Sequence, residues 1–282
     1  MAASGEQTMA INRRKVETMA LTINTTRQRL AAGQMALGFG VHHLRTAATP
    51  MLAAATGHDW LFIDAEHGAF SVQEITQLCI AALPTGVTPI VRVCAGAIDE
   101  ATRALDNGAM GIVIPHVDTA ADAKRISAAF HYPPMGHRSW GGPPAIYGFR
   151  PPANAEAQAA INAEILTIVM LESPEAVANA DAIAAVPGVD VLFIGTSDLT
   201  AELGIPGQMG HQKVIDAYQT VGDACRRHGK TLGMGGVYDE VNAVRYVGMG
   251  ARFLLTGSDH SYILSGANQR SAFFNHLPGT PA

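Results

Sequence analysis

The chain has 282 residues, 48% hydrophobic and 15% charged, which allows a large core and favours one large domain or two small ones. Its net charge of −5 gives no basic footprint for nucleic acid or an anionic membrane, and we expect neither as a partner. Cys79, Cys94 and Cys225 show no CxxC spacing, and no apolar run is long enough to cross a bilayer. We expect a cytoplasmic protein whose residues 1–21, without the apolar centre of a signal peptide, form a loose extension.

In chain order, residues 22–32 indicate a short helix that ends at Gly33, and eight short apolar segments then follow. In most of the eight, a glycine that ends a helical pattern comes before the apolar segment and polar residues follow it. We expect a strand in each: 35–41, 59–63, 89–93, 110–114, 165–171, 189–194, 231–234 and 252–255.

Strict alternation of strand and helix implies parallel strands joined by right-handed crossovers, and eight such units close a (β/α)8 TIM barrel of the α/β class. An open doubly wound sheet is the alternative, but no GxGxxG turn follows the first strand. We expect one domain at 22–277 with a tail at 278–282. Residues 132–152 form a long Pro/Gly-rich loop typical of a lid or an interface arm. An additional helix is expected at 261–276, with apolar residues near its end that need burial.

Titratable residues gather at the carboxyl ends of the predicted strands, where barrel enzymes carry their active sites. A single cluster of this kind is equally explained by a solvated, helix-capping loop, but packing does not explain the same placement on six strands. The residues are Asp64, Glu66, His67, Arg92, His116, Glu172, Asp198 and Asp259.

Glu172 and Asp198 end neighbouring strands, which predicts two carboxylates side by side. An all-oxygen pair suits a hard cation such as Mg²⁺ or Mn²⁺, and without a cation one carboxylate should take up a proton. Alternatively, each residue belongs to the N-terminal cap of the helix that follows it.

Arg92 interrupts an apolar strand, so its guanidinium needs an anionic partner. A substrate carboxylate or enolate and a structural ion pair with Asp64 or Glu66 are equally compatible with the sequence. His67 is either a core histidine or a base oriented by Asp64. Weaker candidates, without the spacing of a zinc site, are His42, His43 and His116.

Five motifs, in the same order and spacing over about 35–274, resemble the HpcH/HpaI class II aldolases. They are FIDAEHG at 62–68, PIVR at 89–92, YPPMGHR at 132–138, LESPEA at 171–176 and FIGTSDL at 193–199.

The resemblance implies a phosphoenolpyruvate/pyruvate-type barrel that cleaves 4-hydroxy-2-keto acids to pyruvate, or a related 2-keto acid, and an aldehyde through an enolate. It implies a divalent metal cofactor (Mg²⁺, Mn²⁺ or Co²⁺) and a hexamer, a trimer of dimers that exchange the C-terminal helix. The implied roles are metal binding by Glu172 and Asp198, enolate binding by Arg92, acid–base catalysis by His67 with Asp64, and carboxylate binding by the backbone at Gly195, Thr196 and Ser197.

One position departs from the family pattern: Met170 stands where many members have Gln two residues before the metal-binding Glu, which affects substrate choice more than reaction type. Three other functions remain open. An acyl-CoA lyase for citryl or malyl esters would need a basic groove for CoA, an oxaloacetate decarboxylase would use the same enolate, and a metabolite-binding protein would catalyse nothing.

Overall fold

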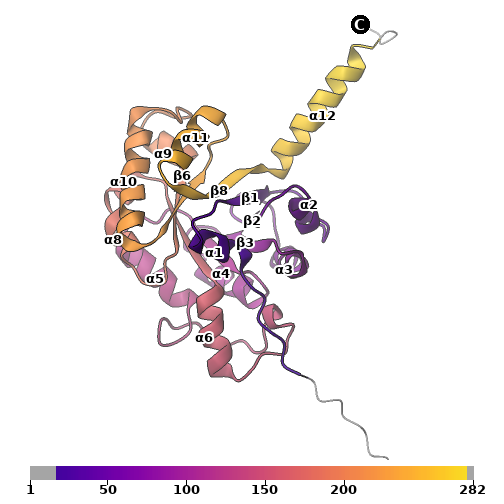
Figure 1. Ribbon diagram of the computed structural model, residues 1–282, viewed down its shortest axis with the longest axis vertical. Helices are drawn as coiled ribbons and strands as arrows, with labels where there is room; N and C mark the ends of the chain where they lie inside the picture. The colour runs from indigo at the N-terminus through magenta and orange to yellow at the C-terminus, as the bar shows by residue number, and fades with distance from the viewer. Residues whose placement is uncertain (1–16, 278–282) are drawn as a thin grey trace, which may run out of the picture.

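Eight parallel strands form a closed barrel in which each strand pairs with the next along the chain and β8 pairs with β1 (Figure 1). The computed structural model describes residues 17–277. The prediction of a (β/α)8 barrel is confirmed, and all eight predicted strands are present. They are β1 (Ala36–Val41), β2 (Trp60–Asp64), β3 (Thr88–Arg92), β4 (Gly111–Ile114), β5 (Leu166–Leu171), β6 (Val191–Gly195), β7 (Thr231–Gly235) and β8 (Ala251–Ser258).

Helices separate successive strands and surround the barrel (Figure 1). Local sequence explains several starts, such as the capping box in which Ser71 and Glu74 begin α3. The helices are α1 (Thr25–Ala31), α2 (Thr49–Ala55), α3 (Val72–Ala82), α4 (Ile98–Asp106), α5 (Ala120–Phe130), α6 (Asn154–Glu164), α7 (Pro174–Ala178), α8 (Ala180–Ala184), α9 (Thr196–Glu202), α10 (Gln212–His228), α11 (Glu240–Gly248) and α12 (Asp259–Asn275), with 3-10 turns η1 (Leu83–Thr85) and η2 (Ala145–Tyr147).

The barrel is filled by side chains that alternate in direction along each strand. On β2, Trp60 and Phe62 belong to the interior cluster, whereas Leu61 and Ile63 pack outward against the helices. Gly38 on β1 leaves room for the indole of Trp60, since a Cβ there would lie 2.3 Å from the ring. Because the interior is packed with apolar side chains, a ligand has access only at the ends of the barrel.

The extra C-terminal helix is present as α12, which points away from the barrel (Figure 1). Ile263 is 54% exposed, Leu264 57% and Phe273 56%, so this helix presents apolar side chains to solvent within one chain. Its exchange between subunits stays a prediction.

Part of the predicted N-terminal extension contacts the long Pro/Gly-rich loop. The Met19 amide donates a hydrogen bond to the Arg150 carbonyl, and just after the extension the Thr22 amide donates to the Ile146 carbonyl. Residues 1–16 of the extension and the predicted tail at 278–282 lie outside the described residues.

Candidate active site

The inward alternation of the strands places three charged residues above the packed interior. Asp64, Arg92 and Glu172 each take the next inward position after the apolar interior residues of β2, β3 and β5. All three are buried, with exposed fractions of 0%, 7% and 2%. The carboxyl end of the barrel therefore carries a buried charged cluster, as the sequence predicted.

Arg92 lies between two carboxylates. It is paired with Asp64 in the register of β2 and β3, and it donates from Nε to Asp64 Oδ1 at 2.9 Å and from Nη2 to Oδ2 at 2.6 Å. Its Nη1 lies 3.1 Å from Glu66 Oε2. Although burial disfavours the charged carboxylate, the Arg92 hydrogen bonds and charge hold the pKa of Asp64 below its ordinary value. The structural ion pair considered from the sequence is thus present.

The imidazole beside Asp64 is that of His42, whose Nδ1 lies 3.3 Å from Asp64 Oδ2. The predicted side-chain pair of His67 with Asp64 is not formed in this structure. The turn after β2 instead directs the backbone amides of Glu66 and His67 to Asp64 Oδ1. The His67 side chain is 65% exposed, with Nε2 3.8 Å from Glu66 Oε2. His42 follows β1, which pairs with β2, so strand adjacency was the sequence signal for it.

Glu172 is buried beside a second carboxylate. Burial, together with the nearby charge of Asp198, raises the pKa of Glu172 to about 7, although it accepts a hydrogen bond from the His116 amide at 2.9 Å. Glu172 and Asp198 line one pocket at the carboxyl ends of β5 and β6. Gly195 makes room for the Glu172 carboxyl group, because a Cβ at position 195 would lie 2.3 Å from Glu172 Oε1.

The donor set at Glu172 and Asp198 fits a hard divalent cation. Both donors are carboxylates, and a buried acid whose ionised form is disfavoured is the group that a cation would stabilise. Within residues 17–277 no group of three or more His, Cys, Asp or Glu side chains could hold a metal ion. Two carboxylates with water or substrate oxygens are a usual ligand set for Mg²⁺.

A pocket of about 310 Å³ connects the cluster with the start of α9. The Thr196 hydroxyl is already hydrogen-bonded to the Tyr218 hydroxyl at 2.8 Å, which leaves the backbone at 195–197 for a ligand. No residue of 132–152 lines this pocket, so the structure gives that loop no role as its lid. The lining residues are His42, Phe62, His67, Arg92, Met170, Phe193, Gly195, Thr196, Ser197, Asp198, Gly235, Gly236, Tyr238 and Leu255.

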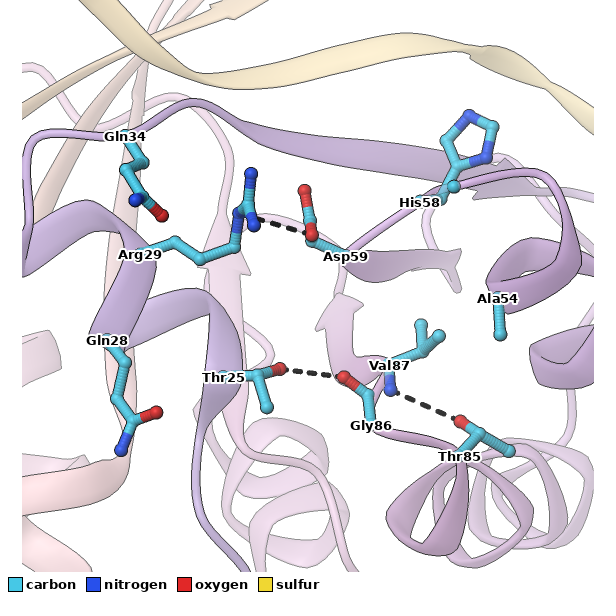
Figure 2. A pocket seen from close by; sticks show the side chains of 11 residues that line it. Thr25, Gln28, Arg29, Gln34, Ala54, His58, Asp59, Thr85, Gly86 and Val87 are labelled. Carbon is cyan, nitrogen blue, oxygen red and sulfur yellow. Dashed lines mark hydrogen bonds and ion pairs between the residues drawn. The ribbon is translucent and has the colours of Figure 1, made fainter.

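A second pocket, shown in Figure 2, lies at the opposite end of the barrel, where the strands begin. There Arg29 points toward Asp59, with Nε 3.2 Å from Oδ1, and the Thr25 hydroxyl donates to the Gly86 carbonyl at 2.7 Å. These contacts tie α1 to the segments before β2 and β3. This end of a barrel contributes to stability rather than chemistry.

The sequence matches the HpcH/HpaI aldolase/citrate lyase family over residues 18–265. The chain belongs to this family. It is 38% identical to the 4-hydroxy-4-methyl-2-oxoglutarate aldolase of Chaetomium globosum, over 87% of this chain and 93% of that protein. It is 33% identical to a 2-keto-3-deoxy-L-rhamnonate aldolase of Shigella boydii, over 90% of this chain and 94% of that protein. The crystal structure of an HpcH/HpaI aldolase from Desulfitobacterium hafniense superimposes with a TM-score of 0.86 at 31% identity, covering 93% of this chain and all of that one (100%).

Membership of the HpcH/HpaI family confirms that the chain is an enzyme, a carbon–carbon lyase of the aldolase type that acts on small keto acids. Class II aldolases of this family depend on a divalent metal. No helix within residues 17–277 is long and apolar enough to span a membrane.

Proposed function

We propose that the enzyme reversibly cleaves 4-hydroxy-2-keto acids to pyruvate, or a related 2-keto acid, and an aldehyde, with a divalent cation as cofactor. The observation that carries the proposal is the buried guanidinium of Arg92 at a pocket that Asp198 also lines, with the buried carboxyl group of Glu172 next to Asp198. Together these groups suit an anionic keto acid and its enolate. The names of the two curated relatives support the same substrate class.

Glu172 and Asp198 would hold the cation, which we propose to be Mg²⁺, Mn²⁺ or Co²⁺. When bound, it supplies Lewis acidity that polarises the keto group and makes the C3 proton acidic. Arg92 supplies positive charge for the enolate oxygen, and Asp64 and Glu66 fix the orientation of its guanidinium.

The keto-acid carboxylate would be bound by the backbone amides at Gly195, Thr196 and Ser197, which line the pocket next to Asp198. Met170 lines the same pocket, where it offers an apolar surface rather than a hydrogen-bond donor. A base must also accept the proton of the C4 hydroxyl during cleavage, and the imidazoles of His42 and His67 both reach the pocket wall.

We also propose a homo-oligomer, a trimer of dimers that exchange α12. The exposed apolar residues Ile263, Leu264 and Phe273 support this, because a helix that leaves its own barrel has to bury such a face elsewhere.

The test is exchange of the pyruvate methyl protons in D₂O, followed by NMR on metal-stripped protein with and without Mg²⁺, Mn²⁺ or Co²⁺. Exchange that requires metal and is abolished in Glu172→Gln is the expected result. Glu240→Gln, at an exposed position in the first turn of α11 and away from this pocket, is the control and should exchange normally. Absence of exchange with every metal would refute the proposed function.

A further inference from the structure

His116 has an unusual backbone conformation just after β4. Its φ is +53°, and within residues 17–277 it and Phe149 are the two residues other than glycine with a positive φ. A side chain in this left-handed region crowds its own backbone, although histidine tolerates it better than most residues. Such a conformation persists only where the surrounding structure holds it, and it is typical of functional sites. His116 also borders the pocket that Glu172 and Asp198 line.

The left-handed turn directs two successive amides at one strand. The His116 amide donates to Glu172 Oε2 at 2.9 Å, and the Val117 amide donates to the Met170 carbonyl at 3.0 Å. In an extended chain the pleat alternates, so two adjacent amides would not both face β5. A left-handed residue turns adjacent N–H groups toward the same side. The conformation of His116 is therefore what brings its amide to Glu172.

That amide orients the Glu172 carboxyl group. Glu172 is 2% exposed, and among residues 17–277 the His116 amide makes the one hydrogen bond to its carboxyl group. The His116 imidazole also approaches Oε2, with Nδ1 3.3 Å away, but this side chain is 56% exposed. Oε1 lies over Gly195, where a Cβ would be 2.3 Å from it. Because Gly195 ends β6 and α9 with Asp198 follows at once, Oε1 is on the side of the second carboxylate.

We propose that His116 is a positioning residue for the metal centre, whose left-handed backbone holds Oε2 of Glu172 and so presents Oε1 to the divalent cation. The proposal rests on the proposed function, in which Glu172 and Asp198 bind the cation. It assigns the role to the backbone amide of His116 rather than to the imidazole. A carboxyl group that is already oriented loses little freedom when a cation binds. Metal affinity should therefore depend on how well residue 116 adopts a positive φ.

The experiment varies this ability and measures metal binding directly. Mn²⁺ is titrated into metal-stripped protein, and free Mn²⁺ is followed by its EPR signal, so that no turnover is needed. His116→Gly and His116→Asn allow the left-handed conformation and should bind Mn²⁺ with wild-type affinity. His116→Ala should bind more weakly. His116→Val, whose branched side chain is least compatible with a positive φ, should lose about 10–100-fold, the usual effect of removing the hydrogen-bond partner of a metal ligand.

Phe149 provides the matched control, because it has a φ of +62° but lines neither pocket of the site. Phe149→Val introduces the same kind of strain elsewhere in the chain and should leave Mn²⁺ affinity unchanged. Thermal melts without metal check that each variant is folded. If His116→Val does not fold, the comparison of His116→Ala with His116→Asn carries the test, since asparagine tolerates a positive φ better than alanine.

Two results would overturn the proposal. Wild-type affinity in folded His116→Ala and His116→Val would show that His116 only shapes the turn. An equal loss of affinity in all four His116 variants would show that the imidazole, and not the amide, acts on Glu172. Absence of Mn²⁺ binding in the wild type, or undiminished binding in Glu172→Gln, would instead refute the proposed metal site.

Discussion

Arg92→Ala removes a buried cation from between two carboxylates. The resulting decrease in the free energy of unfolding can be worked out from the contacts of Arg92. Asp64 is 0% exposed and loses two hydrogen bonds, at 2.9 and 2.6 Å. Removing one partner of a buried ion pair costs about 3–5 kcal/mol. The amides of Glu66 and His67 still donate to Asp64, so we expect the lower end of this range.

The assay is urea unfolding at fixed protomer concentration, at pH 7, on wild type, Arg92→Ala and the double variant Arg92→Ala/Asp64→Asn. The amide carries no charge, so the double variant should recover at least half of the lost free energy of unfolding. Enolate formation, measured by methyl exchange, should fall by about 10²–10³-fold in both variants, because one preorganised donor to the oxyanion is gone.

The pH dependence follows from the lowered pKa of Asp64. A carboxyl whose folded-state pKa is depressed contributes stability that is present above its unfolded pKa, about 3.9, and is lost as the pH falls through the folded value. The difference in free energy of unfolding between the wild type and Arg92→Ala should thus be constant at neutral pH and decrease in acid. Two results would refute this reasoning. One is a decrease in the free energy of unfolding of Arg92→Ala below about 1 kcal/mol at pH 7, which is the range of an exposed ion pair. The other is a double variant that recovers none of the lost free energy.

Three further predictions concern the acidic pair and α12. Burial raises the pKa of Glu172 to about 7, so the metal-free protein should lose stability as the pH rises from about 4.3 toward that value. In Glu172→Gln the urea midpoint should not show this decrease with rising pH. A variant with the same pH dependence as the wild type would contradict the raised pKa of Glu172. Gly195→Ala should weaken stabilisation by Mn²⁺ in thermal melts because its Cβ would meet the Glu172 carboxylate, whereas Gly248→Ala, with open space around it, should not. Ile263→Asp/Leu264→Asp should reduce the oligomer mass in light scattering without unfolding the barrel, and an unchanged mass would remove α12 from the interface.

The sequence predicted the barrel well because buried parallel strands are short apolar runs, and glycine marks the helix ends before most of them. It missed α6, an alanine-rich helix in which only Ala157 and Ile161 are buried, so that little apolar periodicity shows. Alternation of strand and helix also does not show that the helical segment between β5 and β6 is divided at Asn179 into α7 and α8.

At the site, the sequence identified the charged residues but not every pairing. Arg92 with Asp64 was predictable as an alternative, because both end neighbouring strands. The sequence did not predict that the imidazole beside Asp64 is that of His42 and not that of His67. This depends on how the turn after β2 directs its amides and its side chains. Nearness in sequence favoured His67, and the closed barrel brings His42 to Asp64 instead.

Asp259 connects the direction of α12 with the segment that carries His42. It is the first residue of α12, is 0% exposed, and accepts hydrogen bonds from the amides of His42, His43 and Leu44 through one oxygen. A change in the path of α12 therefore moves the anchor of the β1 loop. An oligomer that fixed α12 would therefore also fix the segment that forms this wall of the pocket, and assembly and ligand binding would then be thermodynamically linked through this carboxylate.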